Sequence, residues 1–201
     1  MESKEKPDWH EYYEKTVDVP ARELLVVCLD SLQNKGKAPG IAIDIGCGAG
    51  NETIELLKRG WRVVAIDNQP EALSSVVSRT PDSLRGSLTV ELQSLESLHL
   101  PQAELVWAGY SLSFCRPDRF GDMWRSILDC MSPGAAFAGN IFGPNHVWAA
   151  NEQMTFLNEE KVKLLFEGLV VEHFSELDEP RMTATAGMQH WHDFSVIARK
   201  G

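Results

Sequence analysis

Residues 41–50 read IAIDIGCGAG, and this stretch decides the fold. Its three isoleucines are β-branched, and a short apolar run that ends at a glycine is typical of a strand in the middle of a parallel sheet. Gly46, Gly48 and Gly50 follow at alternate positions. Glycine costs backbone entropy and is used where φ is positive or where a ligand touches the main chain. The stretch therefore predicts a buried strand and then a loop that lies against a ligand.

Outward from this stretch, strand-like and helix-like segments alternate at short spacing from residue 40 onward, the pattern of an α/β sheet with helices on both faces. The last two strand-like runs have no helix between them, so they pair antiparallel most easily. We predict a doubly wound, mostly parallel seven-stranded sheet with an antiparallel C-terminal hairpin, a Rossmann-like fold. The predicted strands are 41–45, 62–66, 88–92, 104–108, 134–141, 169–175 and 189–199.

Capping and stop signals place the helices between these strands. Asn51 is expected to cap a helix that runs to Gly60, and Pro70 suits the first turn of the next. A further helix is expected over residues 118–131, and another at 158–167 between the cap Asn158 and the stop Gly168. We expect one domain over residues 1–201, with a helical lid segment over 1–36 and the Rossmann-like core over 37–201.

Composition excludes several classes of function. The chain has 29 acidic against 19 basic residues and a formal charge of -10, which opposes binding to a phosphate backbone. Its apolar stretches are too short for a membrane span, and residues 1–30 lack a signal-peptide core. Four scattered cysteines argue against a zinc site and a disulfide framework. We expect a cytoplasmic protein without nucleic-acid or membrane partners; the oligomeric state is not readable.

The ligand of the glycine loop is read from its spacing and from the next strand. A nicotinamide dinucleotide fingerprint is GxGxxG, but here the third glycine comes one position early and Asn51 stands in its place. An adenosine-bearing ligand without a pyrophosphate fits better, and the dinucleotide remains an alternative. Asp67 ends the next strand, where its carboxylate can accept both hydroxyls of a ribose. Asp44, inside an apolar strand, either receives loop N–H groups or faces an ammonium group of the ligand.

At this point the chain resembles the class I S-adenosylmethionine-dependent methyltransferases over essentially its whole length. AIDIGCGAGNET at 42–53 is similar to their first motif, VVAIDNQPEAL at 63–73 to their second, and AELVWAGYSLSFCRP at 103–117 to the motif of their fourth strand. The closing GMQHWHDFSVIARK at 187–200 is similar to the C-terminal pattern of small bacterial methyltransferases of the tellurite-resistance-like type. The resemblance implies S-adenosylmethionine as cofactor and a small-molecule methyl acceptor.

The resemblance also implies roles for individual residues. The third strand of the family usually brings an acidic side chain to the adenine amino group, whereas this chain has Ser94 there. A hydroxyl accepts that hydrogen bond more weakly, so we expect cofactor binding to persist. The implied cofactor contacts are Tyr12, Asp44, Gly46, Cys47 and Gly48 for the methionine part, Asp67 for the ribose, Asn68, Ser94 and Leu95 for the adenine, and Ala108 beside the sulfonium centre.

Candidates for the acceptor side lie in less patterned segments. WHEYYEKT at 9–16, with Trp9, His10, Tyr12 and Tyr13, is either a lid over the cofactor or a hydrophobic anchor. The long loop FGPNHVWAANEQMTF at 142–156, with Asn140 before it, either walls the acceptor pocket through His146 and Trp148 or is ordinary loop packing. The candidate catalytic residues are Tyr13, Tyr110 and His146.

Two further histidines and one functional alternative remain. His190 and His192 stand two apart on a strand and face one side with Phe194 and Val196, which favours buried structural histidines over a metal pair. Methyl transfer from a sulfonium needs no metal, because alignment and exclusion of water dominate. A catalytically silent cofactor-binding module stays open as an alternative, since sequence does not show whether a pocket is closed.

Overall fold

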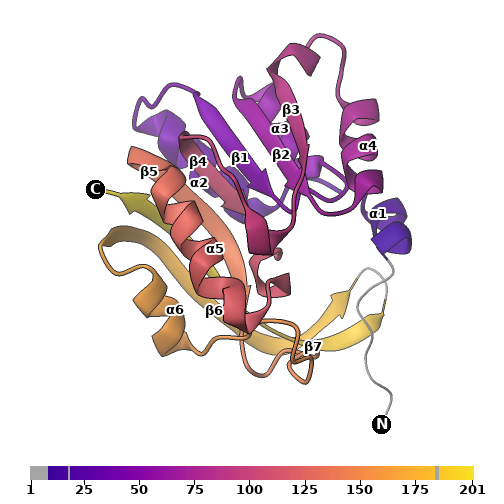
Figure 1. Ribbon diagram of the computed structural model, residues 1–201, viewed down its shortest axis with the longest axis vertical. Helices are drawn as coiled ribbons and strands as arrows, with labels where there is room; N and C mark the ends of the chain where they lie inside the picture. Colours follow the sequence, from indigo (N-terminus) through magenta and orange to yellow (C-terminus); the bar gives the residue numbers. More distant parts are fainter. Residues whose placement is uncertain (1–8, 18, 184–185) are drawn as a thin grey trace.

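A seven-stranded sheet runs through the protein, with helices on both of its faces (Figure 1). The computed structural model describes residues 9–17, 19–183 and 186–201. Five strands run parallel, and β7 is antiparallel to both of its neighbours, as predicted. In spatial order the strands are β3 (Leu88–Leu92), β2 (Arg62–Asp67), β1 (Ile41–Ile45), β4 (Ala103–Ala108), β5 (Met131–Phe142), β7 (Gly187–Lys200) and β6 (Leu169–Thr183).

The strands are apolar on both sides because helices cover both faces of the sheet. In β4, Leu105 and Trp107 pack with the helices of one face, while Val106 and Ala108 pack with those of the other. The first face carries α2 (Glu23–Asn34), α3 (Asn51–Lys58) and α4 (Pro70–Arg79), and the second carries α5 (Pro117–Cys130) and α6 (Glu159–Leu165). Helix α1 (Trp9–Thr16) and the short 3-10 turns Arg85–Ser87, Leu95–Ser97 and Leu112–Phe114 complete the described elements.

Two of the predicted helix signals are confirmed and one is wrong. Pro70 occupies the first turn of α4, and the Asn158 side chain accepts the N–H of Lys161 at 3.1 Å to cap α6. Asn51 does not cap α3, because Gly50, with φ of 86°, takes the cap position. The Asn51 amide instead donates to the carbonyl oxygen of Thr16 at 2.7 Å, which ties α3 to the end of α1.

The C-terminal hairpin is longer than predicted. Strand β6 continues to Thr183, well past the predicted end at residue 175, because β7 pairs with it up to Gly187. Strand β5 pairs with β7 only as far as the Phe142–Asp193 partners. Beyond that point the hairpin no longer pairs with β5, and it projects from the sheet toward the side on which α1 lies (Figure 1).

The N-terminal segment contains two helices in its described part. The buried side of α2 belongs to the core cluster of the first face, and α1 lies over the carboxyl ends of the strands. The lid over residues 1–36 stays a prediction, and residues 1–8 and 18 lie outside the described part. The four cysteines are unpaired and buried. Among the described helices, none has the length and apolar character needed to cross a membrane.

Candidate cofactor and acceptor site

The loop after β1 is wound tightly at all three of its glycines. Gly46, Gly48 and Gly50 have φ of 74°, 50° and 86°, a region that side chains rarely adopt. A Cβ on Gly46 would lie 2.4 Å from the Cβ of Ser111. The backbone N–H of Gly46 donates to the carbonyl oxygen of Ile66 at 2.8 Å, which joins the loop to β2. The positive φ at all three glycines is thus as the sequence predicts, and Gly46 is also required by its close approach to Ser111.

Asp67 connects the end of β2 to this loop. Its side chain is 8% exposed, and its Oδ2 accepts the N–H of Gly48 at 3.0 Å while Oδ1 accepts the N–H of Gln69 at 2.9 Å. Burial raises the pKa of this carboxyl, and the backbone N–H donors act to lower it. A carboxylate offers about four lone pairs. Asp67 therefore keeps acceptor capacity for the two hydroxyls of a ribose.

A cavity of about 1410 Å³ opens at the carboxyl ends of the parallel strands. Ligand pockets in proteins commonly measure about 300 to 1,000 Å³, so this cavity has room for a cofactor and a second molecule. One wall holds the glycine loop, Asp67 and Leu95. Here the open main chain, the ribose acceptor and the apolar surface fit an adenosine-bearing cofactor. Of the predicted cofactor residues, those that line the cavity are Tyr12, Gly46, Cys47, Gly48, Asp67, Asn68 and Leu95.

Helix α1 covers the glycine loop. The Tyr13 ring lies 3.4 Å from where a Cβ on Gly48 would stand, and Trp9 meets Phe114 edge to face at 5.0 Å between ring centroids. Burial, and the nearby charge of Asp67, raise the pKa of the Tyr13 hydroxyl. The helix thus places aromatic rings over the cavity. The side chain of His10 lies outside the described residues.

Arg22 is a central cavity residue for which the sequence gives no motif. Its guanidinium donates to the Glu52 carboxylate at 2.7 Å and to the Tyr12 hydroxyl at 3.1 Å, and lies 5.3 Å from the centre of the Tyr110 ring. Glu52 is buried, and its charge, together with a hydrogen bond, raises the pKa of Arg22 against the opposing effect of burial. Arg22 therefore joins three separate segments at the cavity.

Three predicted cofactor residues do not line the cavity. Asp44 is fully buried and accepts the Thr53 hydroxyl at 2.5 Å, and burial raises the pKa of Asp44 to about 7. The Ser94 hydroxyl pairs with that of Ser97 at 3.0 Å. Ala108 is buried, and the residues after it reach the cavity instead. A direct contact of these three with a ligand stays a prediction.

His146 lies in an aromatic cluster beneath the cavity wall. It is 2% exposed, stacks on Phe142 at 4.0 Å between ring centres, and accepts the N–H of Trp148 at Nδ1 over 3.1 Å. Its Nε2 is buried and has no hydrogen-bond partner among the described residues. Burial lowers the pKa of His146 to about 4. The His146 ring is thus neutral at pH 7. His146 does not line the cavity, whereas Trp148 does.

Among the described non-glycine residues, Tyr110 alone has a left-handed backbone, with φ of 55°. Its ring stacks on Phe142 at 5.9 Å and meets Trp191 edge to face at 5.6 Å. Burial raises the pKa of its hydroxyl, and the charge of Asp193 adds to this effect. Strained backbone of this kind is often stored at functional sites, and Tyr110 stands between the cofactor wall and the hairpin.

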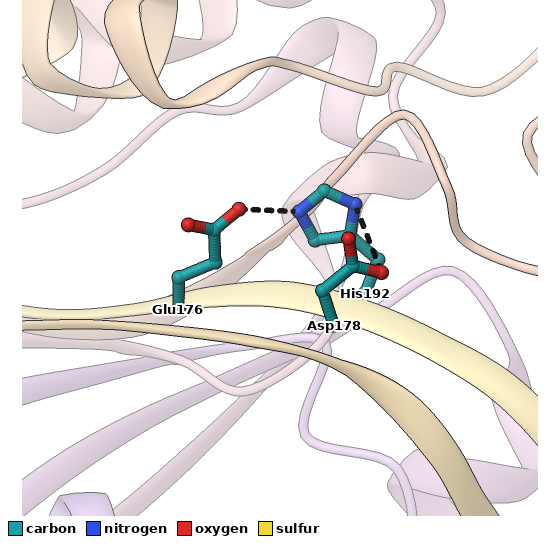
Figure 2. Close-up of side chains that lie close together, drawn as sticks. All are labelled: Glu176, Asp178 and His192. Atoms are coloured by element: carbon teal, nitrogen blue, oxygen red, sulfur yellow. Dashed lines mark hydrogen bonds and ion pairs between the residues drawn. The ribbon is translucent and has the colours of Figure 1, made fainter.

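A charged cluster on the hairpin contains Glu176, Asp178 and His192 (Figure 2). His192 is buried as predicted, with Nε2 at 3.0 Å from Glu176 and with Nδ1 accepting the N–H of Asn145 at 3.1 Å. The prediction that His190 is buried is wrong. His190 lies on the part of β7 beyond its pairing with β5, so its side chain is exposed, and its Nε2 lies 2.7 Å from Asp178 Oδ1.

The atoms of this cluster are near enough for a metal, but hydrogen bonds already engage the ring. Ligand atoms of Glu176, Asp178 and His192 lie within 4.8 Å of one another. Both nitrogens of His192 have partners on opposite edges of the ring, as Figure 2 shows for the two carboxylates. The cluster therefore acts as a clip, and it fixes on the hairpin the loop that carries Trp148.

The sequence is similar to those of known methyltransferases. Residues 42–134 match the family described as a methyltransferase domain. The magnesium-protoporphyrin O-methyltransferase of Rhodobacter capsulatus is 35% identical over 79 residues, which cover 39% of this chain and 35% of the relative. The matched part thus spans about a third or less of the length of the curated relatives.

Solved structures extend the likeness to the whole fold. TehB from Haemophilus influenzae superposes with a TM-score of 0.73 at 12% identity, over 96% of this chain and 67% of that one. The N-methyltransferase NodS from Bradyrhizobium japonicum, solved with S-adenosyl-L-homocysteine, superposes with a TM-score of 0.70 at 15% identity, over 96% and 99% of the two chains. Residues 42–134, just under half of the chain, thus match a methyltransferase domain, and the chain as a whole shares its fold with TehB and NodS.

Proposed function

We propose that this protein transfers a methyl group from S-adenosylmethionine to a small-molecule acceptor. The observation that carries the proposal is the joint between Asp67 and the glycine loop, where a buried carboxylate holds the Gly48 N–H at 3.0 Å on the wall of a cavity large enough for two ligands. This joint supports an adenosine-bearing cofactor rather than a dinucleotide, because the loop lacks the third glycine of the pyrophosphate fingerprint.

Bound S-adenosylmethionine supplies an electrophilic methyl group on a positively charged sulfur. Asp67 accepts the ribose hydroxyls, Leu95 packs beside the adenine, and Gly46 leaves the main chain open to the methionine part. Tyr13 and Tyr110 present aromatic faces around the charged centre, which favours a cation and keeps water out. Arg22 holds Tyr12 and Tyr110 in place through its own contacts.

The acceptor side lies between Tyr110 and the C-terminal hairpin. Trp148 and Trp191 line this part of the cavity, and the Glu176–Asp178–His192 clip fixes the loop that carries the first of them. A small molecule fits such an aromatic-walled cavity better than a polymer does, and the net charge of -10 disfavours nucleic acid. One relative is named for transfer to magnesium-protoporphyrin, itself a small molecule. A walled second compartment also supports an enzyme over a silent module.

The test is transfer of a labelled methyl group. Purified protein is incubated with methyl-labelled S-adenosylmethionine and a protein-free, nucleic-acid-free cell extract, and label is followed into small-molecule products. Label above the level of a heat-inactivated sample, and lost in Asp67→Ala, supports the proposal. Label that enters no small molecule across extracts of several sources contradicts it.

A further inference from the structure

The acceptor end of the cavity contains a group of buried polar side chains. Asn140 on β5 and Ser195 on β7 stand opposite each other in the sheet and both line the cavity. Asp193 lies beneath them, two residues from Ser195 and therefore on the same face of β7. Asn140 is 3% exposed and Asp193 is 2% exposed, so their polar atoms are costly unless they are hydrogen-bonded.

The hydrogen bonds in this group fix which way the Asn140 amide points. Its Nδ2 donates to Ser195 Oγ at 2.8 Å and more weakly to Asp193 Oδ1 at 3.4 Å, and Ser195 in turn donates to Asp193 Oδ1 at 3.3 Å. An ionised carboxylate only accepts, so the end of the amide near Asp193 must be the nitrogen. The oxygen of the amide is then directed away from these two partners.

Asn140 Oδ1 is left without a hydrogen-bond partner among the described residues, and so is Asp193 Oδ2. For Asp193 the neighbouring Trp191 indole and Arg181 favour the charged form, which offsets part of the effect by which burial raises its pKa. For Asn140 no such neighbour is recorded. A buried acceptor on a cavity wall that lacks a partner is an atom that a ligand can satisfy.

The surroundings define the shape of that ligand. Tyr110 and Trp191 meet edge to face at 5.6 Å, and Phe142 stacks on Tyr110 at 5.9 Å. All three line the cavity beside Asn140. Such walls favour a flat, apolar ligand. The unpaired Asn140 Oδ1 favours a ligand that also carries a hydrogen-bond donor.

We propose that Asn140 Oδ1 is the recognition atom of the acceptor site, and that the acceptor is a flat molecule whose hydroxyl or N–H group donates a hydrogen bond to it. Asp193 and Ser195 are positioning residues that hold the amide in this orientation. The inference rests on the proposed methyltransferase function. It disfavours thiolates, which bring no donor. When the methylated atom is the one that carries this hydrogen, the methyl group leaves sulfur and replaces the hydrogen, which leaves as a proton to water, so the site holds acceptor more tightly than product.

The experiment compares matched probes that differ by one donor hydrogen. The protein is first saturated with S-adenosylhomocysteine, with binding verified by calorimetry. Dissociation constants are then measured by NMR titration for phenol against anisole and for indole against 1-methylindole. We expect the donor member of each pair to bind about tenfold more tightly, because a polar site rejects an analogue that leaves its buried acceptor unpaired.

Variants assign the preference to the amide. Asn140→Leu, of similar size but without the acceptor, should reduce the preference to within about twofold. Ser195→Ala loosens the amide and should give an intermediate preference, and it serves if Asn140→Leu does not fold. Ser175→Ala, on the cavity wall opposite Ser195, is the matched control and should keep the full preference.

The outcomes separate this inference from the function on which it rests. Failure to bind S-adenosylhomocysteine counts against the methyltransferase proposal itself. When S-adenosylhomocysteine binds, three results overturn the recognition role of Asn140 alone. These are equal affinity within each probe pair, no binding of any probe, and a preference that survives both Asn140→Leu and Ser195→Ala.

Discussion

At the residue scale, Gly46 combines a left-handed backbone with contact to Ser111, and Gly36 has nearly the same backbone without any neighbour. Their φ angles are 74° and 71°, but only at Gly46 would a Cβ meet another atom, at 2.4 Å. We predict that Gly36→Ala costs about 1 to 2 kcal/mol from backbone strain and that Gly46→Ala costs at least about 1 kcal/mol more from overpacking. Urea unfolding of both variants measures the difference. Equal losses would show that Ser111 gives way freely.

A second residue-scale prediction concerns acid stability and His146. The pKa of His146 is about 4 in the folded protein, because the ring is buried, against an ordinary value near 6.5. Between these values the unfolded chain binds more protons, so this contribution is complete above pH 6.5 and is lost as pH falls toward 4. His146→Phe removes the loss.

The predicted result is a stability difference that depends on pH. The unfolding free energy of His146→Phe relative to the parent should rise by about 1 to 2 kcal/mol between pH 7.5 and pH 5, measured by urea unfolding at both values. Any fixed cost of fitting the larger ring cancels in this comparison. A difference that stays constant over this range would mean that His146 titrates normally.

Sequence was sufficient at this scale where the chemistry is local. The glycines after β1 and Asp67 at the end of β2 were predictable because strand, turn and acid follow one another within a short stretch. Arg22 and Glu52 were not, because they meet across 30 residues and neither stands in a motif. Asn140 was predicted as a wall residue, but its free oxygen depends on Asp193 and Ser195 of a distant strand.

At the scale of elements, α1 is fastened over the cavity through Arg79 of α4. The guanidinium of Arg79 donates to the carbonyl oxygens of Ala49 and Val17 and to the Asn51 side chain. It thereby joins the glycine loop to the chain that follows α1. We predict that Arg79→Met, which keeps the aliphatic stem, loosens α1 and lowers the affinity for S-adenosylhomocysteine about threefold to thirtyfold, as expected for the loss of hydrogen bonds to a charged group.

Arg85→Met provides the comparison, since the Arg85–Asp82 ion pair is exposed and contributes little. Its affinity should match that of the parent protein in calorimetry. Limited proteolysis gives a second measurement, in which the N-terminal segment of Arg79→Met should be cleaved faster. An Arg79→Met variant with parental affinity and parental cleavage rate would show that α1 is held without this arginine.

Element boundaries were predictable where start and stop signals are backbone chemistry. Pro70 and Asn158 opened their helices as expected. Strand β6 extends through SELDEP at 175–180, past its predicted end. Both faces of a hairpin that projects from the sheet tolerate polar residues, so the polarity of this run does not end the strand. The same projection explains why His190 is exposed, whereas His192 is covered by the loop that contains Asn145.

At the scale of the whole molecule, the mostly parallel sheet with helices on both faces and its antiparallel end followed from the alternation of elements. The buried runs on β1, β2 and β4 required helices on both faces, and the absence of a helix between β6 and β7 required a hairpin. The volume of the cavity and the arrangement of its walls could not be predicted, because they arise where α1, the loop after β5 and the hairpin meet in space.

The proposed function depends on binding of S-adenosylmethionine at the joint of Asp67 and the glycine loop. Calorimetric titration with S-adenosylmethionine and S-adenosylhomocysteine, repeated on Asp67→Ala and on the exposed Asp82→Ala, tests it most directly, with a reduced nicotinamide dinucleotide as the rival ligand. We predict binding of both sulfur ligands, weakened by about 1 to 3 kcal/mol in Asp67→Ala and unchanged in Asp82→Ala. If neither sulfur ligand binds to the intact, folded protein, or if the dinucleotide binds more tightly, the proposed cofactor site is contradicted.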